Sequence, residues 1–316
     1  MSALFFMTAG YNDYSSFIKK RFGERVQKIS VNAGFTCPNR DGSKGTGGCI
    51  YCDNTTFNPA YTSVHKPILE QINEGIAYFS EKYPAQKYIT YFQSYTNTYA
   101  SVQVVKERIQ EALSCKEVVG VSVATRPDCI SDEILEMLAG FSKRHFITVE
   151  YGVESTYDAT LKTINRCHSW NDSVQAIRKT AFYGLYCSVH LIIGLPGENE
   201  TDFLNHAVNI SRLPVNFLKL HQLQILSGTA AEKLFNQKPE LFKILSVDEY
   251  TDLMCRFVAK LHPEIIIERF TGESPPERVI APRWDKIKNF EVTEIIRRKL
   301  AEKNISQGMD YPALRP

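Results

Sequence analysis

The chain has 316 residues, of which 43% are hydrophobic and 23% are charged. This is the composition of a soluble globular protein with one large domain, or with one domain and an extension. The formal net charge of +2 is too small to require a nucleic acid as partner. The opening segment, Ala3 to Thr8, is too short for a signal-peptide core, and no apolar run approaches membrane-spanning length. We therefore expect a cytoplasmic protein with no membrane partner.

Apolar periodicity predicts strands that alternate with helices through the first two thirds of the chain. The expected strands are 29–35, 88–92, 118–124, 146–151, 186–193 and 217–223. The expected helices are 14–22, 67–82, 102–114, 132–141, 173–183 and 201–212. Strands that alternate with helices imply a parallel sheet, and in barrel-like α/β enzymes the loops at the carboxyl ends of the strands form the catalytic rim.

The pattern changes after Leu223. Helices are expected at 233–244, 247–261 and 290–303, and a strand is expected at 265–269. The sequence therefore predicts a helical lead-in over residues 1–28, a barrel over 29–230 and a C-terminal extension over 231–316 that packs against the side of the barrel.

Three of the eight cysteines, Cys37, Cys49 and Cys52, lie in a polar, glycine-rich loop after the first expected strand. A structural zinc or a closed iron–sulfur site takes four protein ligands, so three thiols indicate a metal centre with one open position. Three interpretations stay open on this pattern. They are a site-differentiated four-iron cluster, a zinc ion with His65 or another distant residue as fourth ligand, and a thiol–disulfide couple or free thiols at Cys49 and Cys52.

A basic cluster precedes this loop. It consists of Lys19, Lys20, Arg21, Arg25 and Lys28. Such a cluster is usually a solvated helix face, and the alternative is contact with a phosphate-bearing partner. On the zinc interpretation, the protein would be a zinc-stabilised RNA-binding module that uses these residues and performs no redox chemistry.

The order of the motifs resembles the radical S-adenosylmethionine (SAM) superfamily. The three-cysteine loop is followed at the fifth strand by the sequence HLIIGLPG at 190–197. The segments 91–99, 125–128 and 281–284 resemble its YhcC-like branch, which is related to the radical domain of the elongator catalytic subunit. The resemblance covers nearly the whole chain. It implies an α/β fold, a partial (β/α)6 TIM-like radical SAM barrel, with a short α/β C-terminal extension.

The resemblance also implies a reaction and its cofactors. Cys37, Cys49 and Cys52 would hold a [4Fe-4S] cluster whose fourth iron binds SAM, and reductive cleavage of SAM would give a 5′-deoxyadenosyl radical that abstracts hydrogen from a substrate. The electron donor would be a protein such as flavodoxin or ferredoxin. The kinship and the amino-terminal lysines favour a tRNA base as substrate, and a small metabolite or an acyl thioester is the alternative.

Further residues are candidates for the SAM site by the same resemblance. Tyr51 would lie near the adenine, Glu150 or Glu154 would accept from the ribose hydroxyls, and Arg166 would pair with the methionine carboxylate. The end of the second strand would receive the amino group, and the turn after the fifth strand would approach the adenine. These two segments contribute Gln93, Ser94, Tyr95 and Asn97, and Gly194, Leu195 and Pro196.

Several other side chains have two interpretations each. His190 is either a site residue or a hydrogen-bonded structural histidine. Lys219, His221 and Thr229 are candidates to complete the site along the sixth strand, and Arg269, Thr271, Arg283 and Trp284 are candidates for the substrate side, with core packing as the alternative for Trp284.

The chain departs from the superfamily pattern at named positions. Eleven residues separate Cys37 from Cys49, where the usual spacing is three. Gln93 and Ser94 replace a glycine pair, and Cys167 replaces a glycine.

Overall fold

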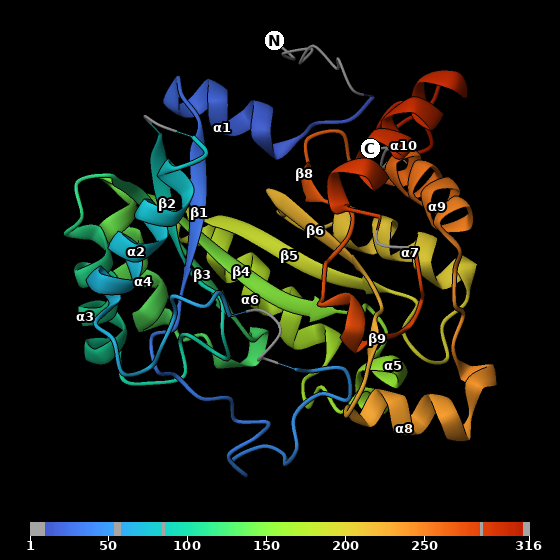
Figure 1. Ribbon diagram of the computed structural model, residues 1–316, viewed down its shortest axis with the longest axis horizontal. Helices are drawn as coiled ribbons and strands as arrows, with labels where there is room; N and C mark the ends of the chain where they lie inside the picture. The colour runs from blue at the N-terminus through green and yellow to red at the C-terminus, as the bar shows by residue number, and fades with distance from the viewer. Residues whose placement is uncertain (1–9, 54–57, 84–85, 285–286, 312–316) are drawn as a thin grey trace.

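The computed structural model describes residues 10–53, 58–83, 86–284 and 287–311. The segment Ala3 to Thr8, considered above as a signal peptide, lies outside these ranges. Seven parallel strands form one sheet in the order β1-β2-β3-β4-β5-β6-β8. The sheet curls into a half-barrel with helices along its outer face (Figure 1). These strands are Val26–Val31, Lys87–Phe92, Val118–Thr125, Phe146–Glu154, Tyr186–Ile193, Phe217–Gln222 and Ile266–Arg269.

Apart from α5 (Asp158–Thr163) and α8 (Ala230–Gln237), the helices occupy the connections that the periodicity predicts. The helix expected at 233–244 is wrong in its bounds, because α8 ends at Gln237 and Pro239 begins a 3₁₀ turn. From α1 to α10 they are Tyr14–Phe22, Ile68–Ser80, Val102–Leu113, Asp132–Ser142, Asp158–Thr163, Trp170–Phe182, Glu200–Ser211, Ala230–Gln237, Val247–Lys260 and Asn289–Glu302. Short 3₁₀ turns lie at Pro127–Cys129, Pro239–Leu241 and Pro276–Arg278. The short helix α5 has too few turns to give a periodic signal, and the prediction lacked it. No helix within the described ranges is long and apolar enough to cross a membrane.

The first strand is shifted towards the N-terminus relative to the prediction. β1 spans Val26–Val31, whereas the apolar run suggested 29–35. After Val31 the backbone leaves the sheet because the side chain of Gln71 on α2 accepts the hydrogen bond of the Asn32 amide at 2.9 Å. Lys28 therefore lies inside the strand and not before it.

Helix α1 closes the amino-terminal end of the barrel. Its buried Ile18 belongs to a cluster with Ile89, Phe146 and Phe217, and the last two are the first residues of β4 and β6. Aromatic contacts of Phe17 with Phe146 and Phe217 complete this packing. The loop that carries the cysteines lies at the opposite end of the barrel (Figure 1). The basic residues of α1 are therefore remote from the carboxyl ends of the strands.

The predicted strand at 265–269 joins the barrel sheet. β8 pairs in parallel with β6, from Phe217 opposite Ile266 to Lys219 opposite Arg269. Helix α9 lies between β6 and β8 in the chain and packs against α7, so β6, α9 and β8 form another βα unit of the barrel. Two short antiparallel strands, β7 (Ile225–Leu226) and β9 (Val279–Ala281), join the segments that follow β6 and β8. The division of the chain into three segments stays a prediction.

Candidate functional site

A cavity of about 220 Å³ lies at the carboxyl ends of the barrel strands. The three predicted thiols line it together with residues near or just beyond the carboxyl ends of β2, β3, β4, β5, β6 and β8. Of the residues predicted to hold the cluster or SAM, those lining the cavity are Cys37, Cys49, Cys52, Tyr51, Gln93, Ser94, Tyr95, Glu154, Arg166 and His190. The tertiary structure thus brings the cysteine loop to the barrel opening, as the strand–loop order predicts.

The cysteine loop is fastened to the segment that follows α5. The fully buried Asn39 donates from Nδ2 to the Asn165 carbonyl at 2.5 Å and approaches Cys49 Sγ at 3.6 Å. In return, Asn165 Nδ2 donates to the Gly48 carbonyl at 2.8 Å. The long stretch between Cys37 and Cys49 therefore has a structural role, because it carries the side chain that orients Cys49 from behind.

Arg166 lies between the cysteine loop and β4. Its Nη2 donates to the Gly152 carbonyl at 2.5 Å, its Nη1 is 3.5 Å from Cys49 Sγ, and Glu154 Oε1 is 3.6 Å from Nη2. Burial opposes the charge of Arg166, but the neighbouring Tyr51, Cys49 and Glu154 raise its pKa well above the ordinary value. Burial raises the pKa of Glu154, and Arg166 opposes that shift. A cation is therefore fixed against a thiol in this wall of the cavity.

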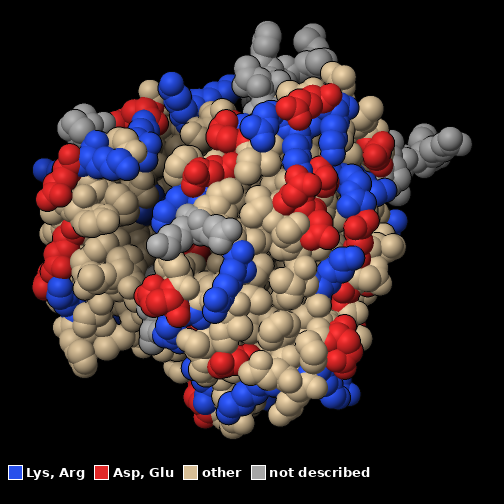
Figure 2. Space-filling view, turned by 45° about the vertical axis from the view of Figure 1, so that its right-hand side comes forward, with Lys and Arg blue, Asp and Glu red and all other residues tan. Residues whose placement is uncertain are grey.

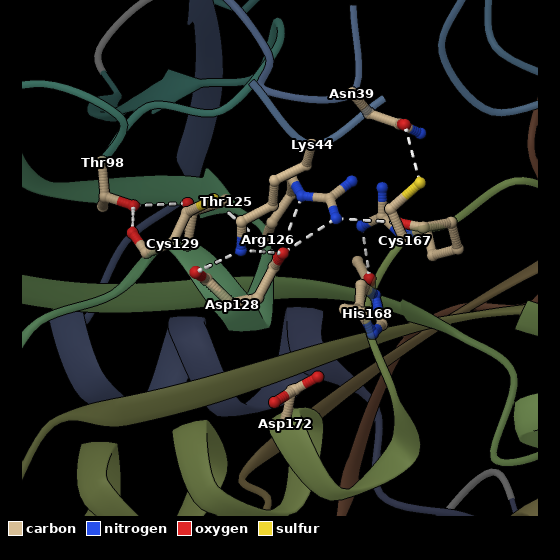
Figure 3. A network of polar contacts seen from close by, with 12 residues as sticks. Asn39, Lys44, Thr98, Thr125, Arg126, Asp128, Cys129, Cys167, His168 and Asp172 are labelled. Atoms are coloured by element: carbon tan, nitrogen blue, oxygen red, sulfur yellow. Dashed lines mark hydrogen bonds and ion pairs between the residues drawn. The ribbon is translucent and has the colours of Figure 1, made fainter. Parts of the chain in front are cut away.

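Arg126, which follows β3, supplies a second buried guanidinium to the cavity wall. Figure 3 shows it beside Asp128 and Lys44. Asp128 binds it twice, at 2.9 Å from Nε and 3.0 Å from Nη2, and Lys44 Nζ approaches Asp128 at 2.6 Å. Although burial raises the pKa of Asp128, the two cations prevail and lower it to about 2. Nη2 also donates to the Arg166 carbonyl at 2.7 Å. The sequence motif at 125–128 marks this residue, but its place in the cavity wall was not predicted.

Two buried nitrogens of these arginines have no hydrogen-bond partner among the described residues. They are Arg126 Nη1 and Arg166 Nε. Buried donors are almost always satisfied in folded proteins, so unsatisfied guanidinium nitrogens beside a cavity indicate an anionic or acceptor ligand. An iron–sulfur cluster held by three thiolates would carry the negative charge that these guanidinium nitrogens require.

A single metal ion is a poorer match to the same residues. Within the described ranges, no three His, Cys, Asp or Glu side chains lie close enough together to hold one ion. His65, the suggested fourth zinc ligand, does not line the cavity. The zinc interpretation therefore has no support from the structure.

Asn97 lies behind the cavity. Its Nδ2 donates to three carbonyls, those of Phe92 at 3.0 Å, Ser94 at 3.1 Å and Ala124 at 2.9 Å. These bonds hold the turn in which Tyr95 adopts a positive φ of 65°. Asn97 thereby shapes the segment that presents Gln93, Ser94 and Tyr95 to the cavity.

Glu150 lies in the barrel interior. It accepts from Lys28 Nζ at 2.7 Å, contacts Lys219 and Ser122, and is 2.9 Å from His190 Nε2. Burial disfavours its charge, but Lys219 and Lys28 hold its pKa well below the ordinary range. Glu150 does not line the cavity itself. It orders a network of charged side chains beneath the cavity, and His190 is the member of this network that it bonds and that lines the cavity.

The turn after β5 also lies outside the lining of the cavity. Gly194 has a φ of 97°, which favours glycine. Leu195 is fully buried in a cluster with Leu161, Ile164 and Leu223, and Pro196 follows it. The neighbouring Gly197 amide donates to the Leu241 carbonyl at 2.8 Å.

Several further residues line the cavity. Tyr91, Gln222, Gln224 and Gly272 line the cavity, and so do the candidates His221 and Arg269. Gln222 pairs with the Gly272 backbone through two hydrogen bonds, of 3.0 Å from Nε2 and 2.9 Å to Oε1. Such contacts join segments 50 residues apart, which no local pattern reveals.

A second cavity of about 450 Å³ adjoins the first. The two share Gln222, Gln224, Gly272 and Ser274 in their walls. The second is also lined by the predicted residues Thr271, Arg283 and Trp284. The indole of Trp284 donates to the Leu245 carbonyl at 2.9 Å, so this side chain both packs and lines a cavity.

Two family models match the sequence. The model of the radical SAM superfamily matches residues 36–208, and the model of the radical SAM C-terminal domain matches residues 215–302. Among curated proteins, YtqA of Bacillus subtilis is 34% identical over 304 residues, which cover 96% of this chain and 94% of YtqA. YhcC of Escherichia coli K12 is 31% identical over 274 residues, which cover 86% of this chain and 87% of YhcC.

More distant similarity extends to proteins that are named for tRNA. The tRNA uridine(34) acetyltransferase of Methanocaldococcus infernus is 27% identical over 192 residues, which cover 59% of this chain and 34% of that protein. Among solved structures, the archaeal Elp3 of the same organism, with an N-terminal deletion, matches with a TM-score of 0.65 and 16% identity, over 89% of this chain and 64% of that one. The half-barrel is thus shared with Elp3.

Proposed function

Because the chain belongs to the radical SAM superfamily, we propose that Cys37, Cys49 and Cys52 hold the [4Fe-4S] cluster of that family and that the adjoining cavity admits a tRNA base as substrate. The chain is a radical SAM enzyme, whose cofactors are a [4Fe-4S] cluster and SAM. The observation that carries the proposal is the position of three thiols in one cavity wall beside two buried arginines with unsatisfied nitrogens.

The bound cluster and SAM supply reductive cleavage of SAM and radical abstraction of a hydrogen atom from a substrate. The protein supplies the electrostatics around them. Two side chains direct N–H groups at Cys49 Sγ: Arg166 Nη1 at 3.5 Å and Asn39 Nδ2 at 3.6 Å. N–H groups directed at a ligating sulfur stabilise the reduced, more negative state of an iron–sulfur cluster.

The remaining wall of the cavity is available for SAM. We assign cofactor contacts to the candidates that line it, namely Tyr51, Gln93, Ser94, Tyr95, Glu154, Arg166 and His190. Asn97, Glu150, Gly194, Leu195 and Pro196 would act from behind, by ordering these side chains and their backbone. Buried side chains with fixed partners hold a bound molecule without reorganisation and keep water from it.

The iron content of the purified protein tests the cluster assignment. After anaerobic reconstitution we expect iron and sulfide in equal amounts, about four of each per chain, and formation of 5′-deoxyadenosine with dithionite and SAM. Cys37→Ala, Cys49→Ala and Cys52→Ala should each lose the cluster. The matched control is Cys167→Ser, because this exposed thiol contacts Asn39 at 3.0 Å but does not line the cavity. A colourless protein with one zinc ion and no iron would overturn the proposal.

For the physiological reductant we propose a small electron-transfer protein such as flavodoxin or ferredoxin. Reduced flavodoxin should then support 5′-deoxyadenosine formation in place of dithionite. A reaction that proceeds with dithionite and with neither protein would exclude both donors.

The similarity to proteins named tRNA uridine(34) acetyltransferase supports tRNA as the substrate. The basic cluster at the N-terminus does not, because α1 packs at the other end of the barrel. Lys and Arg are interspersed with Asp and Glu over the face in Figure 2 and form no large basic patch there. The exposed cations that line the second cavity are Arg283 and Lys288, and we assign the approach of tRNA to this side.

Binding of tRNA at several salt concentrations tests the substrate. Phosphate contacts make affinity fall with salt, and a bound substrate should raise the rate of SAM cleavage. If unmodified tRNA neither binds nor changes that rate, the tRNA proposal is wrong, while the cluster assignment stands on the iron measurement.

A further inference from the structure

A guanidinium without a carboxylate partner lies in the wall of the cavity. Arg269 on β8 donates from Nη2 to His221 Nε2 at 2.9 Å. Its Nε is buried and has no hydrogen-bond partner among the described residues, and none of the ion pairs between described residues includes Arg269. Arg269 as a whole is half-buried, but a buried guanidinium N–H without an acceptor is costly, so this position favours an anionic ligand.

Arg269 reaches the cavity because β8 is irregular at Glu268. The register with β6 advances from Leu218 opposite Ile267 to Lys219 opposite Arg269, so Glu268 is an extra residue. In a regular strand, adjacent side chains point to opposite faces. The bulge lets Glu268 pair with Lys28 at 2.7 Å while Arg269 contacts His221 on the same inner side of the barrel.

The charged groups beneath the cavity do not neutralise Arg269. Glu150 and Glu268 are the carboxylates of this network among the described residues, and both are paired with Lys28 and Lys219. The two neighbouring histidines are uncharged at neutral pH. Burial is the main cause in both, and it lowers the pKa of His190 to about 4 and that of His221 well below its ordinary value. Three cations therefore stand against two carboxylates, and the excess charge lies at the cavity wall.

We propose that Arg269, supported by His221, binds an oxyanion of the substrate, a carboxylate or a phosphate. This inference rests on the proposed function, which assigns the same cavity to SAM and its substrate. A guanidinium binds either anion through two parallel hydrogen bonds. The rest of the substrate would extend into the second cavity, which continues from the first past Gln222 and Gly272.

Anion-dependent thermal stability of the cluster-reconstituted protein tests this site. The probes are acetate, inorganic phosphate and the neutral acetamide, at constant ionic strength. A ligand that binds the folded state raises Tm with its concentration. We expect acetate or phosphate to raise Tm of the wild type and acetamide to leave it unchanged. In Arg269→Gln the apparent Kd for the anion should be at least about tenfold weaker.

Two further variants make the test selective. Arg269→Lys keeps the charge without the planar fork, and should bind the anion with intermediate affinity even if Arg269→Gln fails to fold. Arg256→Gln removes an exposed arginine that pairs with Glu200 on the outside of the barrel, and should respond as the wild type does.

The outcomes separate this inference from the proposed function. A response to acetate alone assigns the anion to a carboxylate, and a response to phosphate assigns it to a phosphate group. Equal anion responses in wild type and both Arg269 variants, or no response in the wild type, would overturn the inference. Iron and sulfide, measured in the same samples, report the cluster assignment independently.

Discussion

Lys28 Nζ lies 2.7 Å from Glu150 Oε1 in the interior of the barrel, and the same nitrogen lies 2.7 Å from Glu268 Oε1. By sequence, Lys28 is the last member of a basic cluster that is expected to be a solvated helix face, with contact to a phosphate-bearing partner as the alternative. In the structure it is a structural cation, because β1 begins at Val26 and Lys28 points inward. Burial lowers its pKa, but Glu150 and Glu268 raise it well above the ordinary value.

Replacing Lys28 should therefore destabilise the fold. Lys28→Met leaves two buried carboxylates with Lys219 as the shared cation, at an expected cost of about 3 kcal/mol in the free energy of unfolding. Urea unfolding, followed by circular dichroism, measures this loss of unfolding free energy. Lys19→Ala, at an exposed position of α1, should leave the unfolding midpoint nearly unchanged. Equal midpoints for the two variants would contradict an interior role for Lys28.

Arg166 should influence the reduction potential of the cluster. A fixed cation 3.5 Å from Cys49 Sγ favours the reduced form, so Arg166→Gln should shift the midpoint to more negative values by tens of millivolts. Arg166→Lys should give a smaller shift, because it keeps the charge and loses the fork. Potentiometric titration followed by electron paramagnetic resonance provides the measurement. An unchanged midpoint in Arg166→Gln would show that this guanidinium does not act on the cluster.

The Asp128 carboxylate should give the protein an acid-sensitive contribution to stability. Its pKa in the folded protein is lowered to about 2 by Arg126 and Lys44, against an unfolded value of about 3.9. The stabilisation is fully present above about pH 5 and is lost progressively as the pH falls towards 1, with a total of between about 2 and 3 kcal/mol. Because buried histidines also titrate on acidification, the quantity to measure is the difference in unfolding free energy between wild type and Asp128→Asn across this window. A difference that is constant with pH would contradict the prediction.

Gly152 is a position where one methyl group should disturb the cavity. A Cβ there would lie 2.6 Å from Arg166 Nη2 and closer still to Glu154 Oε1. Gly152→Ala should therefore displace this ion pair and weaken SAM binding, measured by equilibrium dialysis. Gly140→Ala, where no atom lies within 4 Å of the new Cβ, should raise stability by about 0.5–1 kcal/mol and leave SAM binding unchanged. Identical SAM affinities in the two variants would refute the role of Gly152.

The tRNA proposal predicts which cations bind phosphate. Arg283→Ala with Lys288→Ala should weaken tRNA binding and reduce the salt slope by roughly one for each lost contact. Lys19→Ala with Arg21→Ala, on the α1 side of the barrel, should change neither quantity. The reverse result would place tRNA at the amino-terminal end of the barrel, away from the cavity.

The alternation of strands and helices, the position of the cysteine loop after the first strand, and the family can all be predicted from the amino-acid sequence. These features depend on local periodicity and on spacing along the chain, which remain legible without any long-range contact. The helix bounds of α1 and the strand bounds of β5 agree with the prediction residue for residue.

Which charges lie inside the barrel, and which side chains line the cavity, depends on long-range contacts that form only in the folded chain. The strand expected at 265–269 was assigned to the C-terminal extension. As β8 it is the seventh strand of the barrel sheet, because it pairs with β6, whose residues lie about 50 positions earlier in the chain and leave no local signal of that pairing. The inward orientation of both Glu268 and Arg269 requires a bulge, which alternation cannot anticipate. Lys28 and Arg269 have the residue types of surface cations. Their roles follow from the neighbours that folding gives them, two carboxylates for Lys28 and a neutral imidazole for Arg269.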